Sequence, residues 1–204
     1  MRRIVKVLAG AALIAALGYT PSVRRWCLTC GATDEEVRRP MPGDDMLPAP
    51  EVVSTRGVTI DAPPEAVWPW LVRMAGGAEP VLPEFPQLAV GDVLPPGPAG
   101  PDMRVEICDI PQTLAFRSRD HARVRIFGLS AERGGTRLVS RNRIAAPASV
   151  PRTSVHSAGA ITIVGRAVQR VVLEPGGLVR ERRMLAGIRD SAESCLPAAE
   201  LLPA

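Results

Sequence analysis

The alternation of apolar and polar residues predicts a strand followed by a helix near the start of the folded part of the chain. Residues 51–60 read as the strand, and Pro63-Pro64 opens a helix that ends near Gly76-Gly77. Within that helix, an apolar stripe with i, i+3, i+4 and i+7 spacing consists of Val67, Trp70, Leu71 and Met74. A stripe of this kind is typical of a helix that packs one side against a sheet.

Several short strands follow in quick succession. Apolar residues alternate with charged or small ones in three stretches, and a fourth resumes at 136–144 after a turn at Gly134-Gly135; the apolar positions are Val105, Ile107, Leu114, Phe116, Val124, Ile126 and Leu138. Successive strands with tight turns predict an antiparallel sheet. Because arginines and acids occupy the alternate positions, we expect one covered face and one face exposed to water.

The last periodic segment follows Gly176-Gly177 and predicts a helix of about five turns. Its apolar stripe consists of Leu178, Leu185, Ile188, Ala192 and either Cys195 or Leu196. Residues 160–173 form another β-branched run, whereas 79–89 are irregular. The pattern as a whole predicts an α+β fold, in which an antiparallel sheet grips a long C-terminal helix.

The N-terminal part divides into two segments ahead of a domain at 51–197. Residues 1–25 contain an apolar run at 4–19, preceded by Arg2 and Arg3, that we interpret as a retained membrane anchor. A cleaved signal segment, which would make the protein secreted or periplasmic, is the alternative. Residues 26–50 read as a short helix begun by a Thr33/Glu36 capping box, followed by a proline-rich, extended linker.

Charge and composition exclude two classes of function. Residues 1–40 hold seven of the 25 basic and three of the 21 acidic side chains, so this segment accounts for the net charge of +4. The remainder is neutral and lacks a basic run, so we expect no nucleic-acid partner. The single lysine, Lys6, leaves none for a phosphate loop or a Schiff base in the domain.

Cys27 and Cys30 have the spacing of a redox or metal half-site. A zinc site would need a second ligand pair, and the two histidines, His121 and His156, are far apart in the sequence. Two plain thiols, or a disulfide in an oxidising compartment, remain the alternatives. We therefore expect neither a metal nor a cofactor.

Four stretches resemble blocks of the START-like superfamily, the SRPBCC group of polyketide cyclase/dehydrase and lipid-transport proteins. Arg56-Gly-Val-Thr-Ile-Asp-Ala-Pro-Pro-Glu-Ala-Val-Trp-Pro-Trp-Leu71 resembles its I-x-A-P-x-E-x-V-W-x-W-L opening. Three further stretches of the chain resemble later blocks of the family: Val90-Gly-Asp-Val, Gly135-Thr-Arg-Leu-Val139 and Arg183-Met-Leu-Ala-Gly-Ile-Arg-Asp-Ser-Ala-Glu193. Gly31-Ala-Thr-Asp-Glu-Glu36, after an apolar run, resembles a membrane-anchored subgroup. The resemblance covers residues 31–196 and implies a helix-grip fold.

The resemblance also implies a cavity for a hydrophobic molecule between the sheet and the long helix. The residues predicted to line it are Trp70, Met74, Val105, Ile107, Leu114, Phe116, Val124, Ile126, Leu138, Leu185 and Ile188. The alternative is that they fill a solid core. Residues 75–85 and the segment after Arg143 depart from the family pattern because they lack its aromatic residues, so we expect a smaller or more open cavity.

We therefore predict a membrane-associated, non-catalytic binding module for a hydrophobic small molecule or lipid. Asp120 and His121 are neighbours on a predicted strand and point to opposite faces, so they form a poor acid–base pair. We assign no catalytic residue. A cyclase- or hydrolase-like enzyme remains an alternative, because positioned polar groups alone can catalyse a cyclisation. A structural envelope protein with a closed core is the other.

Overall fold

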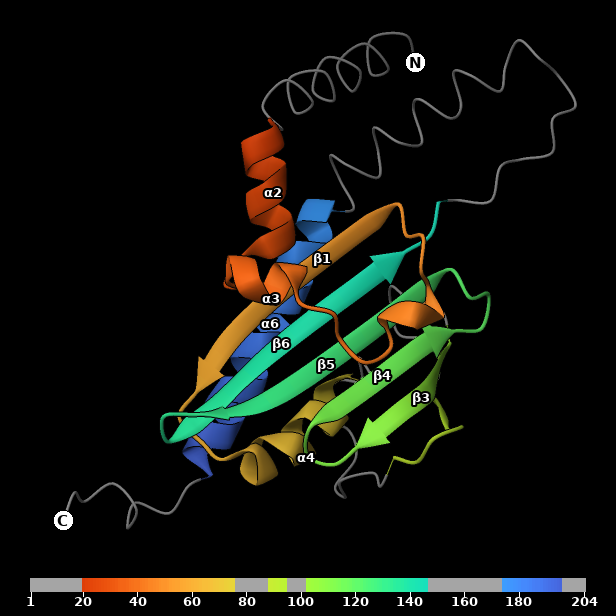
Figure 1. Cartoon of the computed structure of the whole chain (residues 1–204). Coiled ribbons are helices and arrows are strands. Elements are labelled where there is room, and N and C mark those ends of the chain that lie inside the picture. The colour runs from red at the N-terminus through yellow and green to blue at the C-terminus, as the bar shows by residue number, and fades with distance from the viewer. Residues whose placement is uncertain (1–19, 76–87, 95–101, 147–173, 196–204) are drawn as a thin grey trace, which may run out of the picture.

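A computed structural model describes residues 20–75, 88–94, 102–146 and 174–195 (Figure 1). The predicted anchor at 4–19, most of the irregular stretch at 79–89 and the β-branched run at 160–173 lie outside these residues. Within the described ranges, none of the helices combines the length and the apolar character that crossing a membrane requires.

In the described part of the chain, six antiparallel strands form one sheet with the order β1-β6-β5-β4-β3-β2. The strands are β1 (Val52–Ile60), β2 (Val93–Leu94), β3 (Met103–Asp109), β4 (Thr113–Ser118), β5 (Arg123–Glu132) and β6 (Gly135–Ile144). The turn between β5 and β6 places Arg133 and Gly134 at φ of 41° and 90°, as a tight hairpin requires. The predicted antiparallel sheet is confirmed.

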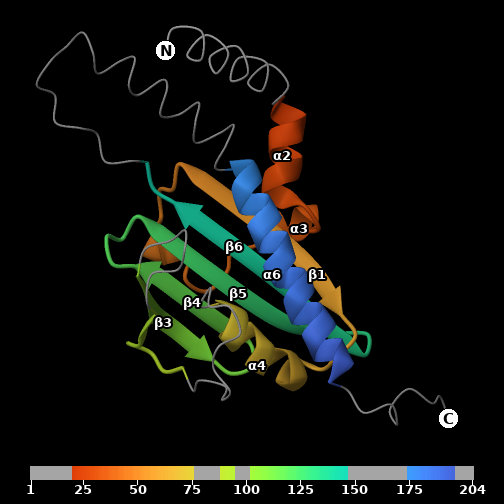
Figure 2. The same cartoon turned by 180° about the vertical axis from the view of Figure 1, so that it is seen from behind.

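Two helices cover one face of this sheet, which we call the inner face (Figure 2). Helix α6 (Glu174–Ser194) crosses it lengthwise, and α4 (Pro64–Ala75) packs against both α6 and the sheet. A sheet that grips a long C-terminal helix is the helix-grip arrangement, so the predicted α+β fold is confirmed. Helix α6 begins at Glu174, whereas the sequence pattern places its start after Gly176-Gly177. Both glycines lie inside its first turn, and no neighbouring atom crowds them there.

Helix α4 buries a wider stripe than the sequence predicted. Val67, Trp68, Leu71 and Val72 are buried, whereas Trp70 is half-buried, with the Arg73 guanidinium 5.6 Å from its ring centre. The predicted stripe omitted Trp68 because it allowed for contact with one surface only. Since α4 packs against α6 as well as the sheet, its buried arc widens to include the neighbouring positions.

The two tryptophans of α4 should therefore differ in their contribution to stability. Trp68→Ala should lower the free energy of unfolding by about 3–5 kcal/mol, as large-to-small changes in a core do. Trp70→Ala, the matched control on the same helix, should lose less than half as much, because Trp70 is only half-buried and part of its surface is already exposed. Urea unfolding of both variants measures the difference, and equal losses would contradict the helix orientation.

The opposite, outer face of the sheet is also covered, contrary to the expectation of a wet face. Two N-terminal elements lie over β6 and β5 (Figure 1): α3 (Asp34–Arg38) and the 3-10 helix η1 (Asp44–Met46). Helix α2 (Pro21–Thr29) precedes them at the β1 edge of the sheet, where it contacts both β1 and α6. The capping box of Thr33 and Glu36 is confirmed. Residues 40–50 are not an extended linker: Met41, Met46 and Leu47 pack on the apolar side chains of β4 and β5.

Arginines of β6 hold this N-terminal segment onto the outer face, where they were expected to be solvated. Arg141 is 3% exposed, and its guanidinium donates to five oxygens: Thr55 Oγ1 at 3.0 Å, Arg39 O at 2.9 Å, Asp44 Oδ2 at 2.6 Å, Glu36 O at 2.6 Å and Val37 O at 3.2 Å. Arg143 donates to Asp44 Oδ1 at 3.1 Å and Leu47 O at 2.9 Å. The carbonyl groups of a short, irregular segment thereby gain buried partners.

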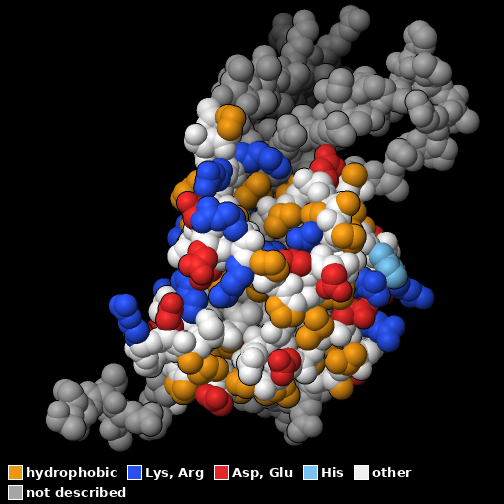
Figure 3. Space-filling view, in the orientation of Figure 1, with side chains coloured by type: hydrophobic (Ala, Val, Ile, Leu, Met, Phe, Trp, Pro, Cys, Tyr) orange, Lys and Arg blue, Asp and Glu red, His pale blue; other side chains and the backbone are white. Residues whose placement is uncertain are grey.

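A third arginine of β6, Arg137, binds the carboxylate of Glu36 through Nε at 2.7 Å and Nη2 at 2.9 Å. Burial would raise the pKa of Glu36, but hydrogen bonds from Arg137 and from the Thr33 N–H, together with the arginine charge, hold it below its ordinary value. Figure 3 shows basic and acidic side chains close together across this face. The outer face is therefore an internal interface formed by ion pairs.

Candidate functional site

The inner face is polar at the end nearest α2. Alternate residues of three adjacent strands point there, and the register places Arg56 opposite Ser140 and Asn142 opposite Arg125. Glu181 of α6 reaches the same place and bonds to Ser140 and Asn142. The other half of the inner face is apolar. Charged side chains thus lie between the sheet and the long helix, where the sequence pattern predicted apolar ones alone.

Glu181 and Arg56 form a buried ion pair, with side chains 8% and 4% exposed. The second oxygen of Glu181 accepts from Ser140 Oγ and, at 2.9 Å, from Asn142 Nδ2. Arg56 also donates to Ser54 Oγ at 3.1 Å and to the Cys27 carbonyl of α2 at 2.8 Å. This network joins α2, β1, β6 and α6, and it occupies both carboxylate oxygens of Glu181.

Among its described residues, the same cluster contains two cations, Arg56 and Arg125, and one anion, Glu181. The Arg125 guanidinium donates through Nε to Asn142 Oδ1 at 3.0 Å, and its Nη atoms make no hydrogen bond with other described residues. Burial lowers the pKa of Arg125, and Arg180, Arg123 and Arg56 lower it further against the opposing charge of Glu181. The buried Nε of Arg56 also lacks an acceptor in the described part of the chain.

Beside this polar cluster lies a rim of partly exposed, flexible apolar side chains. Met74, Met103 and Met184 come from α4, β3 and α6 and are half-buried against the core that contains Phe116 and Phe127. The two phenylalanine rings meet edge to face, with centres 6.3 Å apart. Methionine adapts its shape to what it contacts, and it is common at surfaces that accept varied apolar partners. The inner face therefore offers an apolar rim next to a positive end.

Eight of the eleven predicted pocket residues lie on the inner face. Trp70 and Met74 are half-buried, whereas six have at most 4% of their surface exposed: Val105, Leu114, Phe116, Leu138, Leu185 and Ile188. Those six form a closed core. A role of the eight in contacting a ligand stays a prediction, and the two half-buried side chains are the ones that retain accessible surface.

Ile107, Val124 and Ile126 lie on the outer face instead, packed with Ala115, so the prediction that they face α6 is wrong. Two physical causes explain the error. The N-terminal segment buries the outer face, so apolar residues there are not a mark of the inner face. In β3, a bulge between Val105 and Ile107 shifts the register and moves Ile107 to the other side.

The residues of the polar cluster were missed because arginine was taken to mark the wet face. A signal was present in the parity of the strands. Arg125 shares its parity with Phe127 and Leu129 on β5, and Arg56 shares its parity with Val58 and Ile60 on β1. Since side chains alternate strictly along a strand, a core residue two positions away places the arginine on the inner face.

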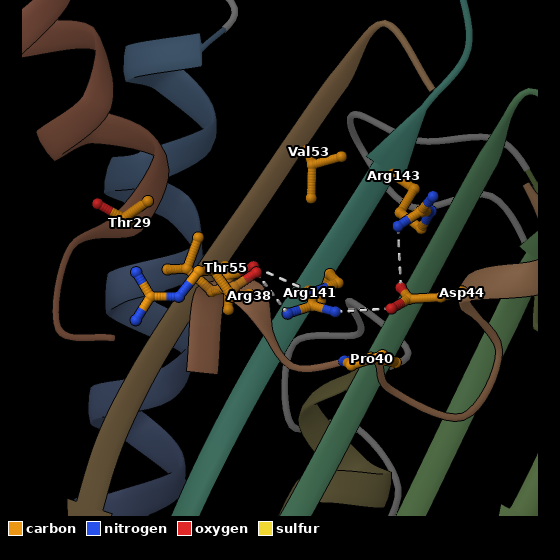
Figure 4. A pocket seen from close by; sticks show the side chains of 9 residues that line it. Thr29, Arg38, Pro40, Asp44, Val53, Thr55, Arg141 and Arg143 are labelled. Carbon is orange, nitrogen blue, oxygen red and sulfur yellow. Dashed lines mark hydrogen bonds and ion pairs between the residues drawn. The ribbon is translucent and has the colours of Figure 1, made fainter. Parts of the chain in front are cut away.

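A pocket of about 480 Å³ on the outer face is a weaker candidate (Figure 4). Its lining includes Arg141, Arg143 and Asp44, and both arginines point to that carboxylate. Because these guanidinium groups already bind carbonyl and carboxylate oxygens, neither of them is available to an incoming anion.

Other groups with possible chemistry stay separate. His121 is exposed at a turn with φ of 58°, whereas His156 lies outside the described residues. Cys27 and Cys30 are free thiols. Over the described ranges, no three histidine, cysteine or acidic side chains gather as a metal site would require.

No family model matches the sequence, and no curated protein matches it either. Solved structures with a similar arrangement include the MLL2253 protein of Mesorhizobium loti, at 16% identity and a TM-score of 0.41, covering 72% of this chain and 100% of that one. A Polyketide_cyc-like protein of Corynebacterium glutamicum is 14% identical with a TM-score of 0.38, and the match covers 67% of this chain and 88% of that one. The Aha1 dimer of Colwellia psychrerythraea is 14% identical with a TM-score of 0.38, and the match covers 59% of this chain and 97% of that one. Likenesses this distant carry no argument about function.

Removing the Glu181 carboxylate should destabilise the domain, because Arg56 would remain buried without its counter-ion. Glu181→Ala should lower the free energy of unfolding by about 3–5 kcal/mol. The double change Arg56→Met with Glu181→Leu should recover most of this loss, since it removes both charges together. Asp190→Ala on the same helix, at an exposed pair, is the control and should change stability by less than about 1 kcal/mol. Urea denaturation that ranks the variants differently would contradict the buried pair.

Proposed function

We propose that the chain is a non-catalytic binding module that holds a hydrophobic small molecule or lipid on the inner face. The observation that supports it is the rim of half-buried methionines beside a closed aromatic core. Apolar surface that stays partly exposed gains free energy when a ligand covers it, by roughly 25 cal/mol per Å². The fold is consistent with this role, because a sheet that packs against one long helix can leave part of its inner face available to a ligand.

Binding rather than catalysis is favoured by how the polar groups are used. Glu181 is the acid of the polar cluster, and its two oxygens are occupied by Arg56, Ser140 and Asn142. A general acid or base needs a free position toward its substrate. The cluster therefore fixes structure and charge, and apolar contact supplies the affinity.

An uncharged fluorescent dye tests the apolar part of this proposal. Nile red should bind the full chain with increased emission, and Met184→Lys should weaken binding at least about tenfold, because it places a charge in the apolar rim. Met46→Lys is the matched control: it is a half-buried methionine on the outer face, and it should leave the dissociation constant within about twofold of the parent's. Absence of dye binding by the parent, or equal losses in both variants, would reject the inner-face site.

The proposal includes attachment to a membrane through residues 4–19. The apolar run and the basic residues before it support this, because short cationic flanks favour the surface of anionic lipids. Full-length protein should sediment with membranes, and deletion of residues 1–19 should release it. A full-length chain found in the supernatant would refute the attachment, and a mature protein beginning near Tyr19 would replace it with a cleaved signal segment.

A further inference from the structure

Among the described residues, the polar end of the inner face holds more positive than negative charge. Arg56 and Arg125 face one acid, Glu181, and that acid is fully engaged by the first arginine and two neutral side chains. Arg125 is half-buried, and its Nη atoms make no hydrogen bond with other described residues, so a partly desolvated cation remains accessible to an anion.

We propose that Arg125 binds the anionic head group, a carboxylate or a phosphate, of a single-tailed amphiphile whose apolar tail lies against the methionine rim. This inference rests on the proposed function and specifies the chemical class of its ligand. The two Nη atoms of Arg125 are the available donors, and a guanidinium edge suits the two oxygens of a carboxylate or phosphate. The head group would supply the negative charge that the cluster lacks.

The surrounding network orients this arginine. Asn142 accepts from Arg125 Nε through Oδ1 and donates through Nδ2 to Glu181, which fixes the side-chain amide in one orientation. With Nε occupied, the remaining donors of the guanidinium lie on its outer edge. Arg123 and Arg180 add positive potential near Arg125, which also favours an anion. A chain of contacts from Glu181 thus holds the binding group in place before a ligand arrives.

The outer face does not compete for this role. Arg141 and Arg143 carry the same charge, but both are already bound to carbonyl and carboxylate oxygens of the N-terminal segment. Arg117, half-buried on β4, is paired with Glu106 at 3.0 Å. Among the buried and half-buried arginines of the described sheet, Arg125 is the one that lacks a carboxylate partner of its own.

The test compares a fluorescent fatty acid, 12-(9-anthroyloxy)stearate, with its methyl ester on the full chain. The acid should bind more tightly than the ester, and Arg125→Met should weaken the acid about tenfold to a hundredfold while leaving the ester within about twofold. Arg117→Met, the control, should change neither probe. Lysophosphatidate should displace the bound acid through its phosphate head, whereas inorganic phosphate at the same concentration should not, because it has no tail.

Nile red binding by Arg125→Met shows that the variant is folded and that the apolar site remains. If the dye binds but the acid and the ester lose affinity equally, or if the acid shows no advantage, the anionic head group is refuted and the proposed function stands. Displacement by inorganic phosphate as strong as that by lysophosphatidate would also overturn the inference, because it indicates a plain anion site. If the parent binds neither dye nor acid, the proposed function itself fails.

Discussion

The structure depends on arginines that project from both faces of the β1–β6 pair and must find acceptors on each. A guanidinium group carries five N–H donors and stays charged, so burying it without oxygens would cost several kcal/mol. On the outer face, Arg141 obtains these oxygens from α3, η1 and the residues between them. On the inner face, Arg56 obtains them from α6 and α2. The arginines thus determine which segments must cover the sheet.

This constraint explains why the N-terminal segment belongs with the sheet. Residues 31–48 have little regular structure of their own, and short helices are marginal in isolation. Their carbonyl groups find fixed cationic partners on β6, and Met41, Met46 and Leu47 add apolar contact. The N-terminal covering lies on the outer face, so the inner face remains available for binding a ligand. There the cationic side chains exceed the acids, and the unbalanced arginine lies beside the accessible apolar rim, an arrangement suited to an amphiphile.

The sequence predicted those features that depend on local periodicity. Helices α4 and α6 and the antiparallel strands follow from the spacing of apolar residues, and the capping box at Thr33 fixed the start of α3. On β4, Leu114 and Phe116 do lie on the inner face, because the positions that alternate with them hold small or polar side chains, and the strand carries one set of large apolar residues. These elements can be predicted from the sequence without knowing which segments pack against them.

The errors came from tertiary contacts that periodicity does not record. Val124 and Ile126 looked like the inner set because the apolar residues of one strand were assumed to face one core, whereas the chain has two. The bulge in β3 reversed Ile107, and a single extra residue of this kind leaves no mark in composition. Proline-rich residues 40–50 looked like a linker, because the arginines that bind them lie about 100 positions later.

The central claim is that the outer covering and the sheet form one cooperative unit held by buried arginines. Native-state hydrogen exchange tests it most directly, because it reports the opening free energy of each amide. The account predicts that the hydrogen-bonded amides of Val37, Arg39 and Asp44 exchange with the same free energy and urea dependence as those of β6. Rates close to those of an unstructured peptide at these three amides, with β6 still protected, would contradict it.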